Sequence, residues 1–553
     1  MITRSASPSR WSGACSLALL LAACGGGGGG SETATTPMAL PGETSLQADC
    51  SASDASCATR GTAYSGQGVG TWLARNDSRF TATLPVTLSG VAGKRITLVY
   101  TNPTASEIPL PGITLSKNAS ANLTATTATP STENQIPARI RDFQPPAFRP
   151  AGAQRSILAA TTGTPHVEGD QRNWYIAATD DTIQTRAATL KKQAALSSGR
   201  HVNFWVEDSE YGGGKITDTL LTTLAGRFAT DASNVYDMVT GVAGAPWGPH
   251  AYPDILAAEQ DIDIVLVNFD RNQKAYGMLG YFWSLNNFRR DASNADLKYS
   301  NESLSFYLDT ETFYLEPTEG VDVQTSTLSH EFVHMINFYQ RMVAPAQPNP
   351  YGTAWEEMSA MMMEDVVGLR LTPASHSIRD TRFPQWLQQR GYNCNLLAWI
   401  DTNTSCFSYS VAGSFGGYLL RQYGIERFYK HFLRNMSVTA TTAPIELLDG
   451  SIRAAGGPGF AEAFRRWTTS VALLPAPGSP AGFGYPERIE SGFTLPALNG
   501  PTYAGTRRLP TSVPATLQPY ASFPFERQST TDVYSETLQI PPGATLSIIV
   551  QNN

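Results

Sequence analysis

Hydrophobic and polar positions follow different periods in different parts of the chain. Residues 61–160 contain short runs with the period of two that is typical of β-strands, such as RFTATLPVTL and RITLVYTN, and Gly, Pro and Asn interrupt them. Residues 480–553 return to Pro-rich turns and end in the strand-like run TLSIIVQ. These patterns predict a β-rich region on either side of the central part of the chain.

The central part, residues 165–475, alternates strand-like and helical patterns. Strand-like runs are found at 173–178, 201–208, 262–270 and 303–309, and helical patterns at 217–230, 323–342, 353–370, 410–434 and 445–474. We therefore expect an α+β domain here, with a mixed β-sheet and packed helices, flanked by the two β-rich regions.

The start of the chain has neither pattern and indicates export. Arg4 and Arg10 precede a short apolar run that ends in small residues, as in a secretory signal. The sequence Leu21-Ala22-Ala23-Cys24 resembles a bacterial lipobox, in which the Cys is acylated. An ordinary signal peptide with an incidental Cys is the alternative.

We accordingly expect a lipoprotein signal peptide at 1–23, lipidation of Cys24, and a flexible tether rich in Gly, Ser and Thr at 24–60. The protein is then exported and lipid-anchored at the cell envelope, or released from it. Because Gly25 and not Asp follows the Cys, the outer membrane is the expected location in a host that has one.

The remaining cysteines fit an oxidising compartment. Cys50 and Cys57 form one local pair, and Cys394 and Cys406 form another. Local disulfides are the simplest of the three possible connectivities. A four-Cys zinc site is the alternative, but the usual C-x₂-C spacing is missing.

Composition limits the classes of partner. The 553 residues are 41% hydrophobic, which is enough for a core, and carry a net charge of −7 without any basic block. A nucleic-acid binder is therefore not expected. Outside the N-terminus no apolar run reaches the roughly 20 residues of a membrane span, so the expected membrane contact is the lipid anchor only.

One motif carries recognisable chemistry, namely His330-Glu331-Phe332-Val333-His334. Residues i and i+4 of a helix share a face, so both imidazoles can bind one Zn²⁺. Glu331 lies about 100° further round the helix, where it can take a proton from a water molecule at the metal. The sequence thus predicts one zinc per chain, bound by His330 and His334, with Glu331 as the catalytic acid/base.

The third protein ligand must come from elsewhere. Asn337 and Arg341 stand where the metzincin extension needs Gly and His, so a carboxylate on a second helix is expected. Glu356 and Glu357 are the candidates. Glu364 follows Glu357 by seven residues, on the same helix face, where it can hold the far nitrogen of a ligating His.

Two further parts of the site have more than one candidate in the sequence. The donor that stabilises the oxyanion is expected to be Tyr409, with His376 and His431 as alternatives. An edge strand that accepts an extended substrate is expected at 280–286 or 303–309.

Three blocks together resemble the hyicolysin-like zinc metallopeptidases, which are glutamate-type zincins. They are HEFVHMINF, WEEMSAMMMED and YSVAGSFGGYLLRQYG, and the resemblance covers about residues 165–435. It implies a zincin fold and secreted cleavage of proteins or peptides. It also implies Glu357 as the third zinc ligand, because Glu357 matches the second acid position of W-x-N-E-x-x-A/S. Glu356 departs from this pattern, since Asn is usual there.

Two other functions are weighed against a zinc endopeptidase. A zincin aminopeptidase has a similar helix pair but needs a G-x-M-E-N amine-binding loop, and no such string occurs here. A surface binding or adhesion lipoprotein with a weak or vestigial peptidase would act through its β-rich regions.

Overall fold

The computed structural model describes residues 44–115, 136–148, 165–345, 348–374, 376–388, 391–401, 406–435, 441–473, 478–498 and 500–551. The expected signal peptide, Cys24 and the first part of the expected tether lie outside the described residues. In the described part of the chain, no helix combines the length and the apolar character that crossing a membrane requires.

Strands from both ends of the chain form a β-sandwich. One sheet has the order β1-β4-β19-β6-β17, and the facing sheet has the order β18-β5-β3-β2. Their bounds are β1 Gln47–Ala48, β2 Thr59–Arg60, β3 Ala63–Tyr64, β4 Val69–Arg75, β5 Ala82–Ser89, β6 Arg95–Asn102, β17 Ala521–Gln528, β18 Val533–Ile540 and β19 Thr545–Gln551. Alternate residues point inward, as the burial of Leu84, Val86 and Leu88 on β5 illustrates.

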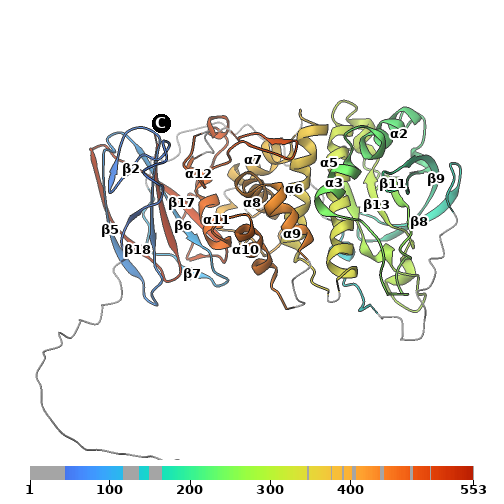
Figure 1. Cartoon of the computed structure of the whole chain (residues 1–553), viewed down its shortest axis with the longest axis horizontal. Helices are drawn as coiled ribbons and strands as arrows, with labels where there is room; N and C mark the ends of the chain where they lie inside the picture. Colours follow the sequence, from blue (N-terminus) through green and yellow to red (C-terminus); the bar gives the residue numbers. More distant parts are fainter. Residues whose placement is uncertain are drawn as a thin grey trace, which may run out of the picture. The chain divides into compact units, whose positions relative to one another are not determined.

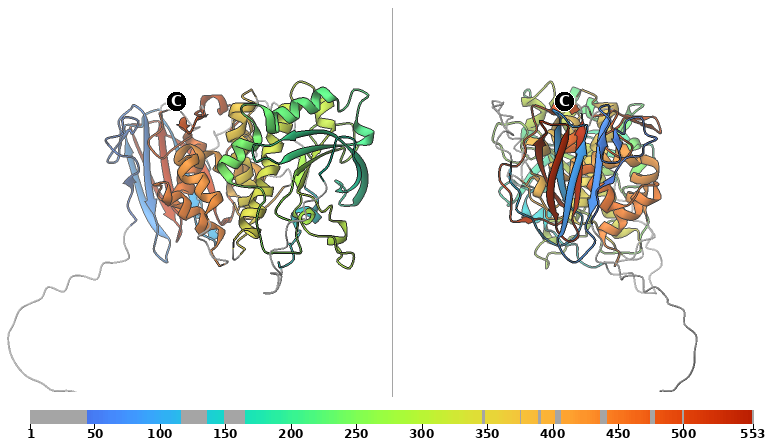
Figure 2. Two further views of the ribbon diagram at one scale, coloured as in Figure 1. Left: turned by 45° about the vertical axis from the view of Figure 1, so that its right-hand side comes forward. Right: turned by 90° about the vertical axis from the view of Figure 1, so that its left-hand side faces the viewer.

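The last strand of the chain lies in the middle of its sheet. β19 pairs with β4 on one side and with β6 on the other, so that Ile548 stands opposite both Trp72 and Leu98. Figure 2 shows these red C-terminal strands beside the blue N-terminal strands. The two expected β-rich regions, 61–160 and 480–553, therefore contribute to one hydrophobic core.

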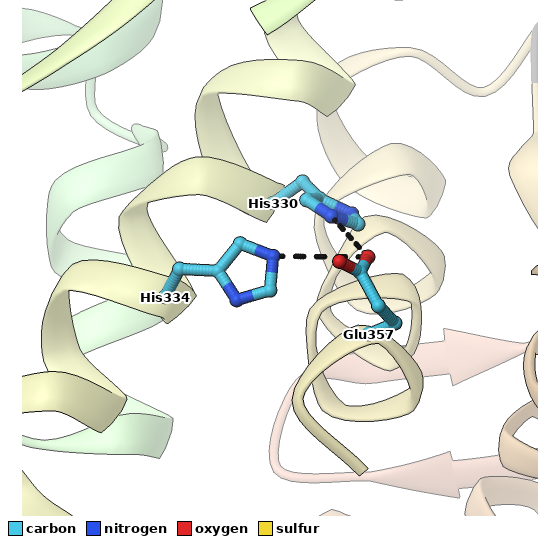
Figure 3. Close-up of side chains that lie close together, drawn as sticks. All are labelled: His330, His334 and Glu357. Atoms are coloured by element: carbon cyan, nitrogen blue, oxygen red, sulfur yellow. Dashed lines mark hydrogen bonds and ion pairs between the residues drawn. The ribbon is translucent and has the colours of Figure 1, made fainter. Parts of the chain in front are cut away.

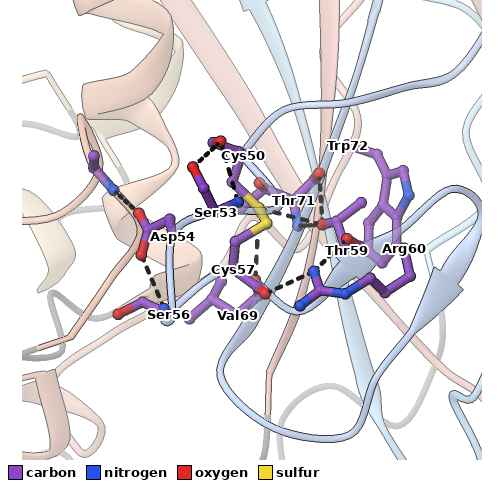
Figure 4. Close-up of a disulfide and its surroundings, with 12 residues drawn as sticks. Cys50, Ser53, Asp54, Ser56, Cys57, Thr59, Arg60, Val69, Thr71 and Trp72 are labelled. Atoms are coloured by element: carbon purple, nitrogen blue, oxygen red, sulfur yellow. Dashed lines mark hydrogen bonds between the residues drawn. A yellow bond between two sulfur atoms is a disulfide. The ribbon is translucent and has the colours of Figure 1, made fainter.

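Residues 44–60 also belong to this sandwich, so the expected tether boundary at residue 60 is wrong. Strands β1 and β2 lie here, and Cys57 and Ala58 are buried. The Cys50–Cys57 disulfide forms, and its loop is fixed by Asp54, which accepts a hydrogen bond from the backbone N–H of Ala481 (Figure 4). A Ser- and Ala-rich composition concealed these contacts, because the ordering comes from a disulfide and from distant partners.

A six-stranded mixed sheet organises the central part of the chain. Its order is β12-β13-β11-β10-β9-β8, with β10, β11 and β13 parallel and the remaining neighbours antiparallel. The bounds are β8 Gln171–Ala177, β9 Ile183–Ala195, β10 His201–Glu207, β11 Ile262–Val267, β12 Gly280–Phe282 and β13 Ser305–Asp309. Every residue of β11 is buried, as is typical of a central strand with both faces covered.

The helices of the central part pack on this sheet and on one another (Figure 1). They are α2 Asp218–Ala225, α3 Val235–Ala243, α4 Glu311–Leu315, α5 Gly320–Phe338, α6 Thr353–Leu371, α7 Phe383–Gln388, α8 Ser408–Tyr423, α9 Lys430–Arg434, α10 Pro444–Ala454, α11 Phe460–Thr468 and α12 Ser470–Leu473. The mixed α+β character of this region agrees with the expectation.

Helix α6 lies between α5 and α8 and is packed against both. Glycines on α8 allow the close approach, because a Cβ at Gly416 would come within 2.7 Å of Met362 Cγ. Met358, Met361, Met362 and Met363 are fully buried, and the first three of them face the glycines of α8. The α5–α6 contact is the part of the fold that builds the site.

Candidate metal centre

Helix α5 carries both histidines of the motif on one face. His330 and His334 are one turn apart, and their ring centroids are 4.8 Å from each other. The helix is buried over most of its length, so His330 and Glu331 lie in the interior, and the His334 side chain is 14% exposed. A buried imidazole needs polar partners, and these come from α6.

Glu357 on α6 completes a converging group with the two imidazoles. Its Oε2 lies 3.1 Å from His330 Nε2 and 3.8 Å from His334 Nε2 (Figure 3). The three ligand atoms all lie within 4.8 Å of one another, and this is the one such His/Cys/Asp/Glu group of three among the residues that the structure describes. Two imidazole nitrogens and one carboxylate oxygen are the donor set that zinc takes in open, catalytic sites.

The other nitrogens of both rings face carboxylates as well. His330 Nδ1 lies 2.5 Å from Glu364 Oε1, and His334 Nδ1 lies 3.5 Å from Glu356 Oε2. Asn337 donates its Nδ2–H to the same Glu356 oxygen at 2.8 Å. Adjacent helical residues point about 100° apart, and for this reason Glu356 meets the outer side of His334 while Glu357 meets the inner side of both rings.

Electrostatics keep the converging carboxylate ionised. Burial alone raises the pKa of Glu357, but the neighbouring His334 and His330 outweigh it, and the net pKa is lowered. The pKa of Glu364 is likewise lowered, because its bond to His330 and the charge of Arg382 outweigh burial. Two ionised carboxylates around His330 therefore favour a cation at this position, and the residues present fit a divalent metal.

Glu331 has the opposite balance. Burial raises its pKa, and the two imidazoles and the backbone N–H of Phe282 offset this effect only in part. A carboxylate with a raised pKa is a better proton acceptor near neutral pH than an exposed one.

Glu331 lines two neighbouring cavities, which together form a cleft. One cavity of about 160 Å³ lies beside Leu279 and Gly280, and a second of about 450 Å³ lies beside Phe282 and Ser284. Both are lined by His330, Glu331 and Tyr409. The cleft follows β12, which is the edge strand of the mixed sheet, whereas β13 is internal. Of the two candidate substrate strands, β12 (residues 280–282) lies at the edge of the sheet, where an extended peptide can pair with it. The other, β13 (residues 305–309), is paired with a strand on each side.

The three candidate oxyanion donors lie in different surroundings. Tyr409, at the start of α8, lines both cavities, and the guanidinium of Arg382 lies 5.3 Å from the centre of its ring. His376 Nε2 instead lies 2.7 Å from Asp365 Oδ1, and His431 Nδ1 lies 3.0 Å from Ser451 Oγ. Only Tyr409 of the three is among the residues that line these two cavities. The Cys394–Cys406 disulfide closes the loop that leads into α8.

The motifs in the sequence did not point to several residues around the site. Arg382 lines the smaller cavity, 3.9 Å from Glu364, and nothing in its sequence context distinguishes it from other arginines. Asp365 forms a fully buried ion pair with Arg421, Nη1 to Oδ2 at 2.6 Å, and joins α6 to α8. The segment 136–145 falls within the expected β-rich region 61–160, but six of its residues line the larger cavity: Ile136, Ile140, Arg141, Phe143, Gln144 and Pro145.

Comparison with protein families decides the class of the chain. The family model described as Peptidase M30 matches residues 181–551, which is more than half of the sequence. The chain belongs to the Peptidase M30 family. It is therefore a peptidase of a metallopeptidase family, and the resemblance inferred from the three sequence blocks is confirmed at this level. The M30 match extends beyond the expected residues 165–435, because it includes the C-terminal strands of the sandwich.

The other comparisons add little to the M30 assignment. Residues 48–115, the N-terminal strands of the sandwich, match a family described as a domain of unknown function. No curated protein matches the chain. Among solved structures, the crystal structure of Legionella pneumophila aminopeptidase A in complex with aspartic acid is 10% identical, with a TM-score of 0.26 over 54% of this chain and 28% of that one. The chain thus spans under a third of that protein, and similarity at this level carries no argument.

Proposed function

We propose that this M30 peptidase is a zinc-dependent endopeptidase, exported and anchored by a lipid at Cys24, which cleaves proteins or peptides. The observation that carries the proposal is the convergence of His330 Nε2, His334 Nε2 and a Glu357 oxygen within 4.8 Å, beside Glu331 in an open cleft.

His330, His334 and Glu357 would hold the zinc, one per chain. Bound there, zinc supplies Lewis acidity, which polarises the carbonyl of the bond to be cut and makes water more acidic. Glu364 at 2.5 Å fixes the orientation of the His330 ring and favours the tautomer that leaves Nε2 free to ligate. Glu356 does the same for His334 more weakly, since its contact is 3.5 Å.

Glu331 is the proposed proton acceptor. Its carboxylate receives the proton of the attacking water and then delivers it to the departing amine, so one group serves as base and as acid. Burial supports both steps, because it raises the pKa of the carboxyl group. Tyr409, which lines both cavities, would donate its O–H to the oxyanion that develops on the substrate carbonyl.

The two cavities favour cleavage within a chain over removal of a terminal residue. Because both cavities border Glu331, substrate residues can be accommodated on each side of the bond that is cut. The edge of β12 offers backbone groups to an extended peptide in the same cleft. An aminopeptidase would instead need a group that binds the free amine and closes one side.

The test is a digest of an unfolded protein by the enzyme without residues 1–43, analysed by peptide mass spectrometry with and without chelator. We expect internal cleavages that disappear with chelator and return with zinc. Glu331→Gln is the matched variant: it should retain zinc and lose the cleavages. Removal of N-terminal residues only, or cleavage that survives chelation, would contradict the proposal. Acylation of Cys24 is tested separately, by mass spectrometry of the N-terminal peptide from membranes.

A further inference from the structure

Residues 136–148 form a strap on the catalytic part of the chain, although they follow the first strands of the sandwich in sequence. The strap contains one short helix, α1 Ala138–Arg141. Arg139 bonds to Asp181 in the β8–β9 turn through its backbone N–H, at 3.1 Å. Arg141 Nη1 lies 3.0 Å from Asp401 Oδ2, near the start of α8. The strap thus spans from the mixed sheet to the helices.

Two aromatic side chains fasten the end of the strap. Phe143 packs edge-on against Trp283, just beyond β12, with ring centroids 6.3 Å apart. Phe148 stacks on Tyr252 at 4.8 Å and also contacts Phe338 of α5. These partly buried aromatic contacts add to the polar contacts of Arg139 and Arg141, so the strap is held at both ends.

The strap is one wall of the larger cavity. Ile140, Phe143 and Pro145 line it on the strap side. Phe338, Met342 and Tyr351 are among the residues that line it from the end of α5, from the turn after α5 and from the segment before α6. His334 and Glu357 lie in the same cavity. About 450 Å³ stays open with the strap in position, so the strap shapes the cleft and does not fill it.

The chemistry of this cavity favours an apolar occupant. Its charged groups away from the metal ligands already have partners: Arg141 pairs with Asp401, and Glu356 accepts from Asn337. A large apolar side chain would contact Ile140, Phe143 and Phe338 there, and its burial leaves these polar contacts intact. The smaller cavity, about 160 Å³, offers less space for a large side chain than the larger cavity does.

We propose that the cavity walled by the strap is the subsite that selects a large apolar side chain, above all an aromatic one, near the bond to be cut, with Ile140 as a specificity-determining contact. This inference rests on the proposed endopeptidase function. Ile140 is suited to test it, because it is half-buried, lines the cavity, and is not one of the strap's anchors.

The experiment profiles cleavage positions in a mixed peptide library for the wild type, Ile140→Asp and Ile140→Trp. Wild-type sites should be enriched in Phe, Tyr, Trp, Leu or Met at one fixed position from the cut. Ile140→Asp should lower kcat/KM for these sites at least about 10-fold and favour Lys or Arg at that position. Ile140→Trp should shift the preference to small apolar residues. Ile489→Asp, on a side chain that is 72% exposed, is the matched control and should keep the wild-type profile.

The outcomes separate the subsite from the function. A wild type that cleaves with no apolar enrichment, or an enrichment unchanged in both Ile140 variants, would overturn the subsite and leave the endopeptidase in place. If Ile140→Asp and Ile140→Trp changed the preferred residue in the same way, the assignment of Ile140 would be overturned. A residue that contacts the substrate side chain should shift the preference differently in the two variants. If the wild type cleaves nothing in the library, the proposed function itself fails.

Discussion

Zinc affinity should fall in a fixed order when the three glutamates of α6 are removed singly: most for Glu357→Ala, less for Glu364→Ala, and least for Glu356→Ala. Glu357 supplies one of three converging ligand atoms, whereas the other two touch the outer nitrogens of the histidines. The order thus tests which carboxylate is a ligand.

The distances set the expected sizes. Loss of a residue that supports a ligating His typically costs 10–100-fold in metal affinity. Glu364→Ala should reach this range, because its contact to His330 Nδ1 is 2.5 Å and its removal leaves a buried N–H without an acceptor. The 3.5 Å contact of Glu356 is at the limit of a hydrogen bond, so about 10-fold or less is expected. Glu357→Ala should exceed about 100-fold, or about 2.8 kcal/mol.

The assay is a competition titration of each metal-free variant against a chromophoric zinc chelator, with melting curves to establish that every variant is folded. Glu426→Ala is a suitable control, because this acid pairs with Lys430 at the surface of the protein. Equal losses for Glu356→Ala and Glu357→Ala would refute the reasoning, and so would a larger loss at Glu364 than at Glu357.

Three further outcomes are expected. Glu331→Gln should lower kcat by about 10²–10⁴-fold with zinc content unchanged, measured by elemental analysis and peptide cleavage, and loss of zinc would make Glu331 a ligand. Replacing both Cys394 and Cys406 by Ser should destabilise the protein by about 3 kcal/mol, because their disulfide closes a loop with a separation of 12 residues; an unchanged urea midpoint would contradict this. Burial raises the pKa of Asp309 to about 7, so between about pH 4 and 7 the folded state binds a proton that the unfolded state has lost, and stability falls as pH rises. Asp309→Asn should remove this loss, so its free energy of unfolding relative to the wild type should rise by about 4 kcal/mol from pH 4 to pH 8. Parallel curves of stability against pH for the two proteins would instead show that the carboxyl group is ionised in the folded state.

The sequence predicted those parts of the protein that depend on local periodicity. The motif helix, the second helix with its two adjacent acids, and the four strand-like runs of the central part all lie within a few residues of their expected positions. The spacing of Glu364 from Glu357 also placed it correctly on the side of α6 that meets His330. These features follow from the 3.6-residue and two-residue repeats, which a single sequence records.

Long-range pairing was not accessible in this way. Nothing in residues 69–102 or 521–551 indicates that these two segments pair, because they lie several hundred residues apart in the chain. The strap was missed for a related reason: Ile140 and Phe143 are unremarkable in their own segment and gain a role only beside Trp283 and the cleft. The side of His334 that Glu356 meets likewise depended on how α5 and α6 pack.

The central position of β19 has a consequence for the order of folding. A ribosome or a secretion channel releases the chain from its N-terminus, so β4 and β6 emerge first and remain unpaired on facing edges until residues 545–551 arrive. The mixed sheet and its helices, which are contiguous in sequence, can assemble in the meantime. The sandwich is thus completed last, and only in chains that include residues 545–551. A product truncated before them keeps two open strand edges, which expose it to aggregation or to degradation by cellular proteases.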